Sequence, residues 1–136
     1  MADLSITAGN IIAVAGYGYL DMTAGEAVAR GKPVYTKAAD GLAYLAGCEG
    51  TSAVAAVTGI CLNDAGANQP VRVMTSGNLG FGAILTIGML YVLSAAGAIA
   101  PHSDLTTSDF VSVLGVATTT SNLRMCIINS GVEVPA

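Results

Sequence analysis

The sequence has no tryptophan, few aromatic residues and very little charge. Charged residues make up 10% of its 136 residues, whereas an ordinary globular domain carries roughly 25%. Hydrophobic residues make up 53%, which excludes a disordered acidic tail, because disorder requires low hydrophobicity and high charge. Five lysines and arginines stand against nine acidic residues, for a net charge of −4. No basic patch is available to neutralise phosphates, so the composition argues against a nucleic-acid partner.

Reactive side chains are scarce as well. The three cysteines, Cys48, Cys61 and Cys126, form no CxxC pair, the spacing that is typical of redox and metal sites. We interpret them as small apolar residues of a protein made in a reducing compartment. We therefore expect no metal site, no cofactor and no enzymatic activity.

His102 is the only histidine, and it stands in the run Pro101-His102-Ser103-Asp104. These residue types occur in hydrolytic triads, but a triad needs side chains that converge from separate elements of the fold. A proline-led turn in which Ser103 or Asp104 caps the backbone accounts for the run more simply. A hydrolase that uses His102 is the enzymatic alternative.

An uncharged stretch extends from Leu79 to Ala100, and about 20 apolar residues suffice to cross a bilayer. Four glycines interrupt the stretch, and no cluster of Lys or Arg flanks it to set an orientation. We expect short strands here and no membrane partner, with a small integral membrane protein as the alternative. Asp3 stands where a secretory signal would be basic, so we expect a cytoplasmic product.

Short β-type runs separated by Gly, Asn and Asp turns predict an all-β fold, a compact barrel or sandwich with at most a short helix. The expected strands are 5–7, 11–15, 27–29, 34–37, 43–46, 55–62, 71–75, 84–87, 90–94, 110–117 and 123–129. The expected turns include 39–41, 63–66, 76–78 and 130–131. An Ala-rich helix is the alternative for Thr51–Val57.

The sequence also contains an internal similarity. Gly25–Tyr35 aligns with Gly82–Val92. Val57–Ile60 aligns with Val113–Val116 if a short loop deletion in the second copy separates the two matches. Chance matching in a chain rich in Gly and Ala is the alternative explanation. We predict one structural domain, with an N-terminal arm and first strands in 1–24 and a β domain in 25–136. Its two halves, 25–77 and 82–131, would be pseudo-symmetric.

The five tyrosines suggest a further alternative function, because tyrosine rings can line a sugar-binding groove. Packing within strands, with the hydroxyl in water, is the commoner use of tyrosine. The residues concerned are Tyr17, Tyr19, Tyr35, Tyr44 and Tyr91. A small carbohydrate-binding β module therefore stays open.

Several ordered blocks resemble the small bacteriophage capsid decoration, or cement, proteins. The blocks are Met1–Ala8, Gly31–Tyr35, Val57–Asn63, Gln69–Gly77, Gly88–Ser94, Gly97–Pro101, Leu114–Ala117 and Ser130–Val132. The chain departs from the family pattern at Asn68, where glycine is expected, and over Ile11–Leu20. The resemblance implies a β-rich structural protein on the outer surface of the virion, bound to the major capsid protein, often as a homotrimer.

Two sets of contact residues follow as hypotheses. The arm alternates apolar and polar side chains, which suits addition to a sheet edge of a capsid subunit; these residues are Leu4, Ser5, Ile6 and Thr7. Pairing of the arm within its own barrel is the alternative. Local hydrophobicity suggests a self-association patch at Leu79, Phe81 and Ile84, since excess apolar surface points to interfaces.

Overall fold

The computed structural model describes residues 3–135, and nearly all of its regular structure is antiparallel β-sheet. This confirms the predicted compact all-β fold. The strands are β1 (Ile12–Ala13), β2 (Gly18–Thr23), β3 (Pro33–Thr36), β4 (Ala43–Leu45), β5 (Val57–Cys61), β6 (Pro70–Gly80), β7 (Leu90–Leu93), β8 (Ile99–Pro101), β9 (Phe110–Ala117) and β10 (Asn122–Glu133). Two single 3₁₀ turns, η1 (Ala8–Asn10) and η2 (His102–Asp104), complete the elements.

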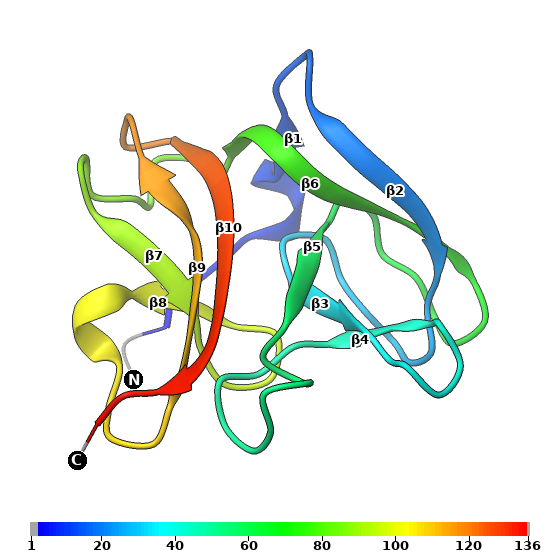
Figure 1. The fold of residues 1–136 in the computed structure, drawn as a ribbon. Helices are drawn as coiled ribbons and strands as arrows, with labels where there is room; N and C mark the ends of the chain where they lie inside the picture. The colour runs from blue at the N-terminus through cyan, green and yellow to red at the C-terminus, as the bar shows by residue number, and fades with distance from the viewer. Residues whose placement is uncertain (1–2, 136) are drawn as a thin grey trace.

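The strands pair in the order β4-β3-β5-β6-β10-β9-β7-β8, and the sheet curls into a half-barrel (Figure 1). The long strands β6 and β10 join the two sides through the register Leu123 to Leu79. Strands β1 and β2 both pair with β6. The chain between them passes over Gly77, where a Cβ would lie 3.0 Å from the backbone of Tyr17. The φ of Gly77 is +108°, which favours glycine at this position.

The two sides of the sheet repeat one hydrogen-bonding pattern. In the first half β3 pairs with β4 and β5, and β5 pairs with β6; in the second half β7 pairs with β8 and β9, and β9 pairs with β10. Val34 faces Gly59 just before a bulge, and Tyr91 faces Gly115 just before the corresponding bulge. The halves are therefore pseudo-symmetric in their strand ladders.

Two apolar clusters fill the molecule, and the ladders show that they correspond. A small cluster in the first half contains Val34, Cys61 and Val73. The equivalent ladder positions in the second half are Tyr91, Ala117 and Leu123, which belong to the large cluster. The large cluster also receives Ile60 and Met74 from the opposite face of the first half. The first half is thus covered on both faces of its sheet.

Several sequence expectations are corrected by the structure. Residues 5–7, 27–29 and 84–87 form no strand, and the predicted turn at 76–78 lies inside β6 because both flanks of that strand are paired. Likewise 130–131 lies inside β10. Strand β2, which sequence reasoning missed, depends on pairing with β6. Thr51–Val57 contains turns in place of a helix, and β5 begins at its last residue.

The uncharged stretch Leu79–Ala100 comprises the end of β6, a long loop, β7 and the start of β8. Within residues 3–135 no helix has the length and apolar character needed to cross a membrane.

Candidate interaction face

Exposed side chains of β1, β6, β9 and β10 lie on one side of the sheet, and we call this surface the outer face. On β10 the side chains of Leu123 and Met125 are buried, while Arg124 between them is exposed. On β6 the neighbouring Leu79 is buried and Asn78 is exposed. Because side chains in a strand alternate between the two faces of a sheet, the exposed residues of adjacent strands gather on one side.

The outer face consists of cross-strand rows. Asn78 pairs with Arg124, and Arg124 pairs with Val116 of β9. The N–H of Val14 donates to the carbonyl of Asn78 at 2.9 Å, which extends the row beyond β1. Ile12 heads the next row, since it pairs with Gly80, which pairs with Asn122. The outer face is defined by Ile12, Val14, Asn78, Val116, Asn122 and Arg124.

Three apolar side chains of this face are open to solvent. The exposed fraction is 65% for Ile12, 42% for Val14 and 37% for Val116. The ladder of the first half has Ile60 and Met74 at the positions of Val116 and Arg124, and both are fully buried. The second half thus presents to solvent a face that the first half buries.

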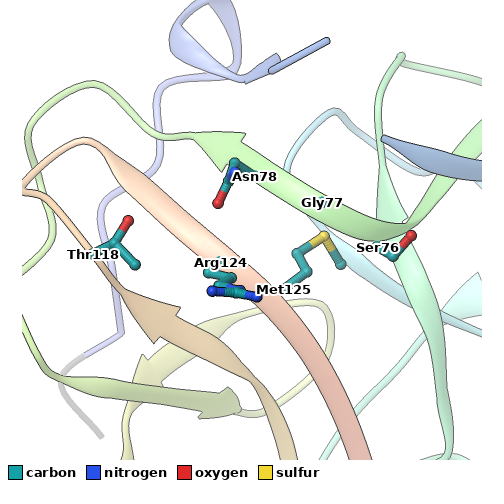
Figure 2. Close-up of a pocket in the computed structure, with 6 residues that line it drawn as sticks. All are labelled: Ser76, Gly77, Asn78, Thr118, Arg124 and Met125. Atoms are coloured by element: carbon teal, nitrogen blue, oxygen red, sulfur yellow. The ribbon is translucent and has the colours of Figure 1, made fainter. Parts of the chain in front are cut away.

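Two hollows lie on this side of the molecule. One, of about 670 Å³, opens where β6 and β10 separate; Figure 2 shows Arg124 on β10, with Asn78 of β6 and Thr118 near it. The other, of about 340 Å³, lies beside Ile12, Val14 and Gly80. Both are open concave surfaces, which suits contact with the side chains of another protein.

Arg124 is the only charged residue that lines either hollow. Within residues 3–135 the single ion pair joins Arg72 to Asp21, so Arg124 has no acidic partner there within 4.0 Å. An apolar surface with one unpaired cation fits a partner surface that is apolar and carries a carboxylate.

The candidate reactive residues do not converge on a site. His102 and Ser103 are exposed in η2, and the turn is closed by the N–H of Leu105 and the carbonyl of His102. A side-chain cap is seen in the turn that follows η2. There the Asp109 carboxylate accepts hydrogen bonds from the backbone N–H and the hydroxyl of Thr106. No group of three potential metal ligands occurs within the part of the chain that the structure describes.

Two of the three cysteines are inert for a physical reason. Burial raises the pKa of Cys48 to about 11, helped by the nearby Asp109 carboxylate, and burial raises the pKa of Cys61 to about 12. A thiol that stays protonated is a poor nucleophile and a poor metal ligand. Cys126 is exposed on β10.

The tyrosines form two separate pairs and one buried residue. Tyr17 lies 5.7 Å from Tyr19, and Tyr35 lies 6.0 Å from Tyr44, between ring centroids. Arg72 covers the Tyr19 ring at 4.0 Å, and Lys37 covers the Tyr44 ring at 4.8 Å. Tyr91 is buried. Since Tyr91 is buried, the five rings cannot all line one groove.

The predicted arm residues 4–7 lie against the chain's own body. Leu4 and Ile6 pack on the large core, while Ser5 and Thr7 are exposed. The N–H of Leu4 donates to the carbonyl of Ile99 on β8 at 2.7 Å, and the Asp3 carboxylate accepts a hydrogen bond from Ser94. Residues 1 and 2 of the arm lie outside the described residues.

Two of the three residues of the predicted self-association patch lie in the core, and the third, Ile84, is half-buried. Leu79 and Phe81 are fully buried in the large core, and Ile84 packs against it. Local hydrophobicity alone could not distinguish a surface residue from a core residue here. The sequence also contains no signal for the outer-face residues. Val14, Val116 and Arg124 stand in short strands or loops whose local sequence is not unusual.

A comparison with protein-family models and with curated proteins found no match to this chain.

Proposed function

We propose that this chain is a decoration protein of a bacteriophage head, which binds the outer surface of the major capsid protein lattice and stabilises the expanded shell. One observation carries the proposal beyond the sequence resemblance. The outer face is open to solvent, although its equivalent in the first half is buried. A surface of this kind supports a role in binding another protein rather than in chemistry.

The outer face has the composition expected of the centre of a protein interface. Such centres are apolar and poor in charge, with arginine favoured among the charged residues. Ile12, Val14 and Val116 supply apolar area, and Arg124 supplies one cation. We expect the facing capsid surface to place a carboxylate beside Arg124, because a cation buried without a partner would weaken binding.

Binding of this kind stabilises a shell by mass action. A ligand that binds the assembled lattice and not its separated subunits shifts the equilibrium toward the lattice. Many copies on one shell multiply a modest individual contact. Low surface charge is compatible with this role, because a protein that tiles a lattice covers much of its surface with neighbours.

The arm is a second proposed contact. Addition of residues 4–7 as a strand to a capsid sheet would supply backbone hydrogen bonds, but it requires Leu4 and Ile6 to leave the core on which they pack. If the arm stays in place, only the exposed Ser5 and Thr7 can touch the shell. The two modes predict different responses to mutation.

Self-association as a homotrimer is also proposed, from the resemblance. Light scattering of the purified chain at micromolar concentration tests this directly. A clean monomer would contradict an obligate trimer, and it would leave assembly on the lattice as the only route to a trimer.

The decisive experiment is co-sedimentation with expanded empty heads assembled from the cognate major capsid protein. Val14→Glu places a charge on the outer face, and we expect at least about tenfold weaker binding, equivalent to ~1.4 kcal/mol. Leu20→Glu is the matched control, because Leu20 is 50% exposed on β2, away from the outer face. Circular dichroism checks that both variants are folded.

The outcomes separate the contacts. Loss of binding in Val14→Glu with normal binding in Leu20→Glu supports the outer face. Loss in Ser5→Glu or Thr7→Glu, or in a chain lacking residues 1–8 that remains folded, supports the arm. Failure of the unaltered chain to sediment with expanded heads contradicts the decoration function itself.

A further inference from the structure

A cavity of about 250 Å³ lies under the N-terminal arm, and none of the residues that line it belongs to the outer face. The apolar side chains of Leu4 and Ile6 form part of its wall, and the backbone around Gly97 forms another part. Arg30 and Lys32, on the turn that precedes β3, line the same cavity. Two of the five basic residues of this acidic chain therefore share one small space.

Neither basic side chain has an acidic partner among residues 3–135. The single ion pair within residues 3–135 is that of Arg72 with Asp21, so no carboxylate there lies within 4.0 Å of the Arg30 or Lys32 head group. The Asp64 carboxylate accepts a hydrogen bond from the backbone N–H of Arg30 at 2.8 Å, not from its side chain. The Nε atom of Arg30 is buried and has no hydrogen-bond partner among the described residues.

A buried donor without a partner is costly, and native proteins rarely leave one unsatisfied. The Nε itself is closed to solvent, but the two terminal nitrogens of the Arg30 guanidinium are not among the buried unpaired atoms, so an occupant of the cavity can supply an acceptor to them. The cavity also sets the size and polarity of that occupant, since one part of its lining is cationic and the rest is apolar.

We propose that this cavity binds a carboxylate carried on a short aliphatic chain. The two carboxylate oxygens match the guanidinium fork of Arg30, Lys32 adds a second positive charge, and the aliphatic part contacts Leu4 and Ile6. A phosphate has no apolar part to fill the remaining lining. The carboxylate comes either from a free small acid or from an acidic side chain of a partner. The proposal does not depend on the decoration function.

The site also connects ligand binding to the arm. Leu4 and Ile6 belong both to the cavity wall and to the arm. An occupant that contacts them is bound only while the arm is docked, so occupancy stabilises the docked arm. The backbone N–H of Leu4, bonded to Ile99, then exchanges more slowly with solvent.

Titration of the labelled full chain with sodium butyrate, followed by NMR at constant ionic strength, tests the proposal. We expect saturable shifts of the amides of residues 4–8, 29–32 and 97–98, with half-saturation near ~1 mM. Butyramide, the neutral isostere, should give no saturation. An N-acetylated glutamate amide is the probe for a partner side chain: tighter binding than butyrate assigns the source to a partner, and weaker binding assigns it to a small acid.

Variants decide whether the basic residues are responsible. Arg30→Gln should weaken butyrate binding at least about tenfold, whereas Lys37→Gln, beside Tyr44 and outside the cavity, should leave it unchanged. If Arg30→Gln does not fold, butyrate binding by Lys32→Gln, which keeps Arg30, provides a second test. The proposal is overturned by shifts that do not saturate, by equal shifts with butyramide or inorganic phosphate, or by normal binding in both cavity variants.

Discussion

The two halves of the molecule share one strand ladder but use its faces differently. Ile60 and Met74 of the first half are fully buried against the large core. Val116 and Arg124 occupy the same ladder positions in the second half and reach solvent. The same strand pairing therefore occurs in both halves, but the side chains at equivalent positions determine whether a face of the sheet is buried or open to solvent.

Charge is divided unevenly between the halves as well. Residues 25–77 contain eight charged side chains and residues 82–131 contain three. The eight are Glu26, Arg30, Lys32, Lys37, Asp40, Glu49, Asp64 and Arg72, and the three are Asp104, Asp109 and Arg124. The low charge of the whole chain is thus mainly a property of the second half, which also contributes Val116, Asn122 and Arg124 to the outer face.

The largest predicted effect compares Met74 with Arg124. Met74→Ala leaves a cavity in the core and should reduce the free energy of unfolding by about 3 kcal/mol. Arg124→Ala removes a solvent-exposed side chain and should change it by less than about 0.5 kcal/mol. Urea unfolding followed by circular dichroism measures both. Similar losses in the two variants would contradict the difference in burial.

The next prediction concerns two glycines that should behave alike. A Cβ at Gly59 would collide with the carbonyl of Met74, and a Cβ at Gly115 would collide with the carbonyl of Arg124. Each alanine substitution should therefore cost about 2 kcal/mol, as overpacking does. Gly9→Ala is the control, because no atom lies within 4 Å of its Cβ position. Tolerance at only one of the two sites would show that the ladders are not equivalent there.

Much of the ladder is predictable from sequence, because β3, β5, β7 and β9 are short apolar runs bounded by turn residues. Strand β2 is not, since Gly18–Thr23 has no strong alternation and forms a strand by pairing with β6. The same tertiary contact converts Gly77 from an expected turn into a crossing point. Local sequence carries no information about a pairing partner that lies about 50 residues away along the chain.

The candidate surface was less predictable than the strands. Hydrophobicity marked Leu79 and Phe81, which the structure buries, because a local run does not indicate which side of a sheet a residue faces. The outer face depends on the register that joins β1, β6, β10 and β9. Leu4 and Ile6 do alternate as predicted, but their apolar sides cover the chain's own core.

The third prediction uses Cys61, which has Ala117 as its counterpart in the second half. Burial raises the pKa of Cys61 to about 12 from an ordinary value near 9. The folded state therefore disfavours the thiolate, so this contribution to stability is complete below pH 9 and is lost as the pH rises toward 12.

Cys61→Ala, which imitates the second half, should reduce this loss of stability. Urea unfolding at about pH 8 and about pH 10.5 measures the difference between variant and parent. Cys126→Ala is the control, because Cys126 is exposed. An equal pH dependence in parent and Cys61→Ala would contradict the assigned role of burial.

The smallest predicted effect concerns the charged cluster of β2 and β6. The Nε of Arg72 donates to Asp21 at 2.9 Å while its guanidinium lies over Tyr19. The hydrogen bond to Asp21, and after it the nearby Tyr17 side chain, raises the pKa of Arg72. The pair is exposed, and exposed ion pairs contribute little because water and salt screen them. Asp21→Asn should lower the urea midpoint less than Met74→Ala or either of the substitutions at Gly59 and Gly115, and the loss should vanish in ~1 M NaCl, where charges are screened within about 3 Å. A large loss of the urea midpoint that does not depend on salt would mean that this cluster holds β2 to β6. The charged side chains there would then have a structural role and would not serve only to solvate the surface.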